Sequence, residues 1–163
     1  MPRWAFHSQV YFLAEKARLH GQIEAWQGHI GQDRTIWEDA EIFAAHLART
    51  GVMSEDEHAT YRALYDALSA SLRPPDLLVY LRCPVRTLRR RIAARGRDME
   101  RGLPAKYLRS LHGLYERWFD SYDLGEKVVF DTDRFDPVTD LVDLRAAVDT
   151  LAPHFPTRAP VES

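Results

Sequence analysis

The sequence contains a single cysteine, Cys83, among 163 residues, so no disulfide bond can form within the chain. One cysteine favours a reducing compartment. The sequence also lacks a run of about 18 apolar residues, which argues against a transmembrane helix, and its N-terminal stretch has no signal-peptide pattern. A basic excess is missing too, because the formal net charge is −2, and this argues against a general nucleic-acid binder. We therefore predict a cytoplasmic protein with neither a membrane nor a nucleic acid as its partner.

Lysine is scarce, because only Lys16, Lys106 and Lys127 are lysines among the 22 basic residues. Planar guanidinium groups bind phosphate and carboxylate groups through paired hydrogen bonds, although a GC-rich gene would produce the same bias towards arginine. The hydrophobic fraction of 45% and the charged fraction of 28% are ordinary for a globular protein. We predict one domain at residues 1–152, followed by a flexible tail at residues 153–163.

Segments with helical and strand-like periodicity alternate along the chain, which predicts an α/β fold with a parallel sheet and surrounding helices. The strand-like segments are residues 28–32, 76–82 and 127–131. Residues 76–82 (DLLVYLR) form a nearly continuous apolar run, which predicts a central strand buried on both faces. Ser54 and Glu57 have the spacing of a capping box. Helices are predicted over residues 4–20, 38–49, 55–72, 84–95, 104–122 and 138–151.

Three strands are few for six helices, and we expect part of the sheet to be missing from this sequence. Asp33, Arg34 and Thr35 follow the strand-like segment 28–32. Ligands of open α/β sheets bind at the carboxyl ends of strands, where Asp33 could hold a metal ion and Arg34 could contact a hydroxyl or phosphate group. The three residues alone favour the alternative, a surface turn whose ion pair contributes little, because short motifs also match by chance.

Arginines are concentrated after residue 81, and Arg91 and Arg95 share one helical face. Arg97 continues this group into a glycine-bounded loop that contains Asp98 and Glu100. Guanidinium groups this close repel one another unless an anion such as a polyphosphate neutralises them, and a loop carboxylate could bind a sugar hydroxyl as a lid closes. A solvated helix face with a salt-bridged loop accounts for the same residues equally well. The arginines are Arg82, Arg86, Arg89, Arg90, Arg91, Arg95, Arg97 and Arg101.

Gln9 and Asp39 each lie near the start of a predicted helix. A glutamine side chain offers a donor and an acceptor together, which suits the edge of a nucleobase, but both residues also fit an ordinary polar surface. The histidines have no metal-ligand spacing. The following aromatic residues are interpreted as core residues rather than as a base-stacking platform: Trp4, Phe6, Tyr11 and Phe43.

Four long segments of the sequence match a known family in order and spacing. They are RWAFHSQVYFLAEKARL, QDRTIWEDAEIFAAHLARTGVMSEDEHATYRALYD, RPPDLLVYLRCPVRTLRRRIAARGRDMERGLPAKYLRSLHGLYERW and VVFDTDRFDP. Between Arg3 and Pro137 the chain resembles bacterial deoxyadenosine/deoxyguanosine kinases of the deoxynucleoside kinase family. The resemblance implies a P-loop NTPase-like parallel sheet and ATP-dependent phosphorylation of the 5′-hydroxyl of a deoxynucleoside in nucleotide salvage. Deoxyguanosine or deoxyadenosine is the expected substrate, Mg²⁺ the metal, and a homodimer or a heterodimer with a related kinase subunit the expected assembly.

The resemblance also implies roles for individual residues. Asp33 would help hold Mg²⁺ and Arg34 would lie beside the 5′-hydroxyl, while Thr35 replaces the usual serine. The nucleoside contacts of the family fall on Gln9 and Asp39 for the base edge, Phe43 for stacking and Glu100 for the 3′-hydroxyl. The phosphate contacts of the lid fall on Arg91, Arg95 and Arg97, and the loop near the adenine of ATP on Arg134 and Phe135.

The sequence departs from the family in one large respect, because it contains no G-x-x-x-x-G-K-[ST] phosphate loop. The strand that ends near the family's glutamate general base is absent as well. In the family's sheet order, 2-3-1-4-5, residues 28–32, 76–82 and 127–131 would be strands 3, 4 and 5. The missing strand 1 would lie between strands 3 and 4, so we expect this chain alone to be marginally folded and not to transfer phosphate.

Three other interpretations stay open at this point. A non-catalytic nucleoside-binding subunit, or pseudo-kinase, is favoured by the absent phosphate loop. A nucleoside monophosphate kinase of similar architecture, such as a thymidylate kinase, would need an additional phosphate pocket. An RNA-binding arginine helix is disfavoured by the net charge of −2.

Overall fold

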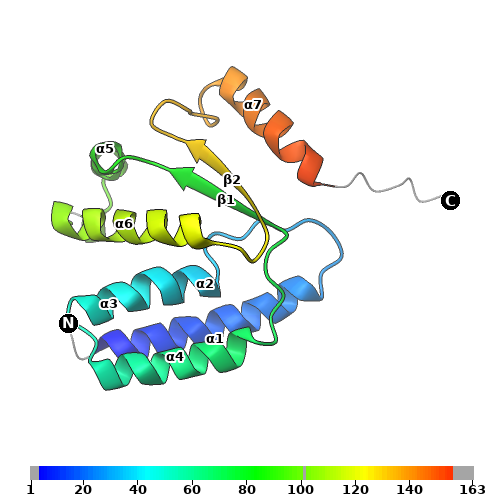
Figure 1. Cartoon of the computed structure of the whole chain (residues 1–163). Helices are drawn as coiled ribbons and strands as arrows, with labels where there is room; N and C mark the ends of the chain where they lie inside the picture. Colours follow the sequence, from blue (N-terminus) through cyan, green and yellow to red (C-terminus); the bar gives the residue numbers. More distant parts are fainter. Residues whose placement is uncertain (1–3, 101, 156–163) are drawn as a thin grey trace.

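The computed structural model describes residues 4–100 and 102–155, which form a layer of helices beside a small parallel sheet (Figure 1). The helices α1, α2, α3 and α4 lie together, and α6 lies between them and the two strands (Figure 1). The strands are β1 (Leu77–Arg82) and β2 (Glu126–Asp131). The helices are α1 (Ala5–Glu24), α2 (Ile36–Glu38), the π-helix η2 (Asp39–Ala44), α3 (Ala45–Arg49), α4 (Glu55–Ser69), α5 (Val85–Arg95), α6 (Ala105–Ser121) and α7 (Leu141–Leu151), with short 3-10 helices η3 (Asp98–Glu100) and η4 (Ala152–His154).

The predicted α/β fold is confirmed, and so is the parallel pairing of the second and third strand-like segments. β1 and β2 pair in parallel from Leu77 opposite Glu126 to Arg82 opposite Asp131. The prediction of a strand at residues 28–32 is wrong, because these residues form an irregular connection between α1 and α2. Within residues 4–100 and 102–155 the sheet therefore has two strands.

The prediction that residues 76–82 are buried on both faces is also wrong. Leu78 is buried, but Val79 and Leu81 on the other face are 37% and 60% exposed. An apolar run stays buried on both faces only where helices cover both sides of the sheet. The second apolar face of β1 is open in this structure, and Val128 and Phe130 of β2 lie opposite Val79 and Leu81 on it.

The main core lies between the helices rather than against the sheet. A smaller cluster of Leu78, Phe119 and Tyr122 joins β1 to α6, and Trp118 packs against both clusters. This arrangement fixes α6 against the helical layer and the strands at once. The buried members of the main cluster are Leu13, Ile36, Trp37, Ala40, Ala44, Met53, Tyr61 and Tyr65.

Residues 36–49 form one continuous helical run that begins two residues earlier than predicted. Thr35 caps it, because its hydroxyl accepts from the Trp37 amide (3.3 Å) while the Glu38 carboxylate accepts from the Thr35 amide (2.9 Å). The predicted capping box at Ser54 is confirmed, with 2.8 Å from the Ser54 amide to Glu57 Oε2. Both helices therefore have ends specified by local sequence.

The C-terminal part of the described chain folds back onto earlier elements. The predicted domain boundary at residue 152 falls in η4, where His154 Nδ1 lies 2.6 Å from Glu126 Oε2. The Phe155 ring contacts His29 with a centroid separation of 5.0 Å. Residues 156–163 of the predicted tail lie outside the described residues. Among the residues that the structure describes, no helix combines the length and apolar character needed to cross a membrane.

Candidate functional site

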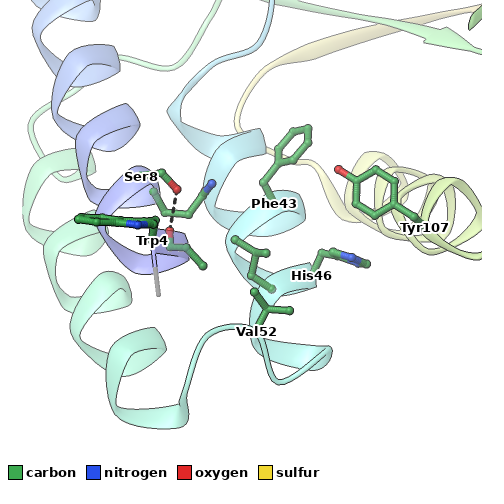
Figure 2. Close-up of a pocket in the computed structure, with 9 residues that line it drawn as sticks. Trp4, Ser8, Phe43, His46, Val52 and Tyr107 are labelled. Atoms are coloured by element: carbon green, nitrogen blue, oxygen red, sulfur yellow. Dashed lines mark hydrogen bonds between the residues drawn. The ribbon is translucent and has the colours of Figure 1, made fainter. Parts of the chain in front are cut away.

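A cavity of about 360 Å³ lies between the start of α1 and the helical run 36–49 (Figure 2). Most of its lining is aliphatic or aromatic with a few polar groups, which is the usual character of a small-molecule site. α1 supplies one wall and η2 and α3 the facing wall, while α6 closes one side through Tyr107. The lining residues are Trp4, Ala5, Ser8, Gln9, Phe43, His46, Leu47, Val52 and Tyr107.

Gln9, which is predicted to bind the base edge, lines this cavity. Its Oε1 atom is buried and has no hydrogen-bond partner among the described residues. A buried polar atom without a partner costs free energy, so it requires an explanation. A ligand that offers a hydrogen-bond donor at this point would satisfy the amide oxygen.

Phe43 and Arg34 lie together at the same site. The Arg34 guanidinium lies over the Phe43 ring, 5.0 Å from its centroid. Arg34 has φ 62°, the one positive φ of a non-glycine residue in the described chain. Such backbone strain persists where surrounding structure enforces it, and it clusters at functional sites. The predicted catalytic pair of Asp33 and Arg34 is exposed and adjoins the predicted stacking residue.

Asp39, the other residue predicted to contact the base edge, lies in an ion pair. It is buried, and its carboxylate pairs with Lys16 Nζ at 3.0 Å. Lys16 also donates to the Thr35 carbonyl at 3.3 Å, and Asp39 does not line the cavity. Lys16 is not among the predicted site residues, although it lies seven residues after Gln9 and therefore on the same face of α1.

The π-helical turn explains how Asp39 and Phe43 are positioned. η2 spans Asp39–Ala44, and a π-helix widens the backbone by one residue per turn. π-turns inside α-helices occur frequently at functional sites. In this chain η2 holds the Lys16 partner at its first residue and the cavity aromatic four residues later.

His46, which is not among the predicted site residues, connects the cavity to α6. Its Nδ1 atom lies 2.9 Å from Ser110 Oγ, and its ring contacts Tyr107 edge-on with a centroid separation of 5.1 Å. Burial, and then the charge of Arg49, lowers the pKa of His46, so the ring is neutral near pH 7. Because α6 follows the arginine-rich loop, His46 joins the cavity to that loop.

Arg95 at the end of α5 and the loop residues Arg97 and Glu100 are brought together. Arg95 donates from Nη2 and Nε to the Glu100 carboxylate at 2.6 and 3.1 Å, and Arg97 Nη1 lies 3.9 Å from it. Arg91 is separate from this group, because it donates to the hydroxyl (3.1 Å) and carbonyl (2.6 Å) of Thr132. Arg101 lies outside the described residues. The carboxylate of Glu100 thus occupies an arginine fork that suits phosphate equally well.

Arg134 and Phe135 lie in the loop after β2, at the carboxyl edge of the sheet. The Phe135 ring stacks on Phe130 at 5.0 Å with an interplanar angle of 9°. The preceding Asp133 accepts hydrogen bonds from Thr87 and from Arg86 Nη2, and these bonds lower the pKa of the Asp133 carboxyl. This loop is anchored to α5, and Arg134 is exposed beside it.

The residues around Asp33 fit a Mg²⁺ ion only if phosphate oxygens supply part of its coordination. The described residues contain no group of three or more His, Cys, Asp or Glu side chains that could form a protein cage for a metal ion. Mg²⁺ is usually held by one or two carboxylates together with substrate phosphates and waters. The exposed carboxylate of Asp33 meets that lesser requirement, because phosphate oxygens and waters would supply the remaining ligands.

Comparison with known proteins assigns the chain to a family. The model of the family "Deoxynucleoside kinase" matches residues 1–151. A deoxyadenosine/deoxycytidine kinase of Bacillus subtilis is 34% identical over 152 residues, covering 92% of this chain and 70% of that protein. A deoxyguanosine kinase of Lactobacillus acidophilus is 31% identical, covering 91% of this chain and 68% of its own length. Rat deoxycytidine kinase is 32% identical over 125 residues, and this chain covers 48% of it.

Solved structures support the same fold. Deoxyadenosine kinase from M. mycoides with bound dATP superimposes with a TM-score of 0.77 at 24% identity, covering 93% of this chain and 75% of that one. At this identity the likeness concerns the fold alone, and it confirms the helix-flanked parallel sheet. Together with the match over residues 1–151, this shows that the chain belongs to the deoxynucleoside kinase family of phosphotransferases.

Proposed function

We propose that this chain supplies the acceptor pocket and the lid of an ATP-dependent kinase that phosphorylates the 5′-hydroxyl of deoxyguanosine or deoxyadenosine. The observation that carries the proposal is the apolar cavity in which Gln9 has an unpartnered amide oxygen and Phe43 touches Arg34. The names of the relatives, which include deoxyadenosine and deoxyguanosine kinases, support the same substrate class.

The direction of the nucleoside follows from the contact of Arg34 with Phe43. The base occupies the cavity, where it meets the Gln9 amide and the Phe43 ring, and the 5′-carbon points towards the Arg34 guanidinium. Arg34 then stabilises negative charge that develops at the transferred phosphoryl group. Asp33 would hold Mg²⁺, which neutralises phosphate charge when it is bound.

The lid completes the site by exchanging partners. Arg95 and Arg97 are held by the Glu100 carboxylate. Phosphate oxygens would replace that carboxylate on the two guanidinium groups, and the released Glu100 would accept a hydrogen bond from the sugar 3′-hydroxyl. Arg134 and Phe135 would contact the adenine of ATP from the loop after β2.

The isolated chain is proposed to bind the nucleoside without transferring phosphate, because its sequence has no phosphate loop. The same observation favours a second candidate, a non-catalytic nucleoside-binding subunit that pairs with a related kinase chain. Both candidates place the protein in the cytoplasm as a homodimer or heterodimer. A nucleoside monophosphate kinase is the third candidate.

Isothermal titration of the 163-residue chain with deoxyguanosine, deoxyadenosine and deoxycytidine, and then with ATP·Mg²⁺, tests the proposal. We expect binding of the deoxypurines, which Gln9→Leu weakens by about tenfold, the value of one hydrogen bond to a buried amide. Gln22→Leu, on the far half of the same helix, is the matched control.

Three outcomes separate the candidates. Failure of every nucleoside to bind a folded chain refutes an acceptor pocket. Tighter binding of a nucleoside monophosphate than of its nucleoside indicates the monophosphate kinase. Phosphoryl transfer from radiolabelled ATP by the purified chain alone would refute the claim that the missing loop is required.

A further inference from the structure

Tyr115 of α6 packs on Phe43, although it is not among the predicted site residues. Its ring meets the Phe43 ring at 85°, with centroids 6.3 Å apart. The Arg34 guanidinium lies over the same Phe43 ring at 5.0 Å. Phe43 is therefore a shared neighbour of Arg34, which precedes α2, and of a residue on the helix that follows the lid. This places a tyrosine of α6 at the end of the site where Arg34 lies.

The hydroxyl of Tyr115 is not used by the fold. It makes no hydrogen bond with any residue in the ranges 4–100 and 102–155. The hydroxyls of Tyr61 and Tyr122 also lack partners among these residues, but both are fully buried, whereas the hydroxyl of Tyr115 keeps some exposure. Tyr115 can therefore donate to a ligand without breaking a hydrogen bond within the protein.

Charged groups of the site act on this hydroxyl. Burial raises the pKa of Tyr115 to about 12, and the positive charge of Arg34 opposes that rise. Three carboxylates of the same region, those of Glu38, Asp39 and Asp33, raise the pKa further. The hydroxyl therefore stays protonated at neutral pH and acts as a hydrogen-bond donor. A neutral donor can approach a hydroxyl or phosphate oxygen near Arg34 without the repulsion that another carboxylate would add.

The ring of Tyr115 is held in place from the side of the sheet. Tyr80 of β1 stacks on it, with centroids 6.1 Å apart and planes at 10°. The Tyr80 hydroxyl donates to Glu116 Oε1 at 2.7 Å, and Arg82 Nε lies 3.1 Å from the other oxygen of the same carboxylate. The orientation of Tyr115 is therefore fixed before a ligand arrives, which lowers the entropy cost of a hydrogen bond to that ligand.

We propose that Tyr115 is a further acceptor-site residue, whose hydroxyl donates a hydrogen bond to the 5′-oxygen of the bound deoxynucleoside beside Arg34. This inference rests on the proposed function, in which the 5′-carbon points towards the Arg34 guanidinium. It adds a donor from α6 at that end of the site, because Arg34 and Tyr115 share Phe43 as a neighbour. The bond would orient the 5′-hydroxyl rather than recognise the base.

The affinities of the wild-type chain and Tyr115→Phe for deoxyguanosine and for 2′,5′-dideoxyguanosine, which lacks the 5′-hydroxyl, test this bond by isothermal titration. Tyr115→Phe removes the hydroxyl and keeps the ring that packs on Phe43 and Tyr80. We expect the variant to bind deoxyguanosine about fivefold more weakly, the value of one hydrogen bond. Its affinity for the 5′-deoxy analogue should stay within about twofold of wild type, because that ligand has no 5′-hydroxyl to bind.

Tyr122→Phe is the matched control, because it removes a buried hydroxyl at the C-cap of the same helix and should leave both affinities unchanged. Thermal melts give a second readout: Tyr115→Phe should keep the wild-type Tm, and a lower Tm would reveal a partner within the protein and overturn the proposal. An equal loss of affinity for the two ligands, or no loss for deoxyguanosine, would also overturn the role of Tyr115 and leave the acceptor pocket intact. A folded wild-type chain that binds neither ligand would overturn both.

Discussion

Replacing Lys16 with methionine removes the cation that faces Asp39 and leaves a carboxylate inside the helical layer. The two side chains are 20% and 10% exposed, and their charged atoms are 3.0 Å apart. Methionine keeps most of the aliphatic length of lysine, so the change removes charge and little volume. The perturbation therefore removes the ion pair between α1 and η2 together with the hydrogen bond from Lys16 to the Thr35 carbonyl, and the cycle below separates the two.

The expected cost follows from the burial of the pair. An exposed ion pair contributes about 0–1 kcal/mol, whereas removing one partner of a buried pair costs about 3–5 kcal/mol. Because Lys16 retains some exposure, we expect Lys16→Met to lower the free energy of unfolding by about 2–4 kcal/mol. For a chain of this size that corresponds to a fall in Tm of about 5–15 °C.

Urea denaturation of a double-mutant cycle with Lys16→Met and Asp39→Asn measures the coupling. The asparagine amide has the shape of the carboxylate without its charge, so adding Lys16→Met to the Asp39→Asn background should cost about 1 kcal/mol or less. A coupling energy below about 0.5 kcal/mol would show that solvent screens the pair and that the burial argument is wrong.

Two further substitutions test other groups of the helical layer. Burial lowers the pKa of His46, so the unfolded chain binds the proton more readily and the free energy of unfolding should fall as the pH drops below about 6.5. The variant His46→Asn can still bond Ser110, and its Tm should fall less than that of the wild type between about pH 7 and pH 5. An identical fall in Tm in the two proteins would exclude His46 as the source of the pH dependence. Tyr61 is fully buried and its hydroxyl lacks a partner among the described residues. Tyr61→Phe should therefore leave the free energy of unfolding unchanged or raise it by about 1 kcal/mol, whereas Tyr61→Ala should lower it by about 3–5 kcal/mol. A decrease above about 1 kcal/mol for Tyr61→Phe in urea denaturation would reveal a hydrogen bond at that hydroxyl.

Features set by neighbouring residues could be predicted from the sequence. The capping box of Ser54 and Glu57 is contained in four residues, and its hydrogen bonds form as expected. The helix after Thr35 was predicted two residues short, because Ile36 and Trp37 precede the periodic segment that was used to find it. The parallel strands β1 and β2 were found because their apolar runs are short and bounded by turn residues.

Features set by distant contacts could not be predicted in the same way. Residues 28–32 contain one strand-favouring residue, Ile30, but a strand exists only when another strand pairs with it, and Ile30 is 44% exposed here. The ion pair of Lys16 and Asp39 joins two helices and has no local sequence signal. Trp4 was assigned to the core because aromatic residues usually are, and only the structure places it at a cavity.

The acceptor cavity and the lid are stabilised by different interactions, and this predicts an order of binding. The cavity walls belong to helices that pack in the main core, and Gln9 is already placed there with an unpartnered atom. The lid arginine Arg95 is instead satisfied by Glu100, so an incoming phosphate must first displace a bidentate carboxylate. A nucleoside can therefore occupy the cavity without rearranging the lid. Tyr107, which lines the cavity, and His46, through its bond to Ser110, are the contacts by which an occupied cavity would restrain α6.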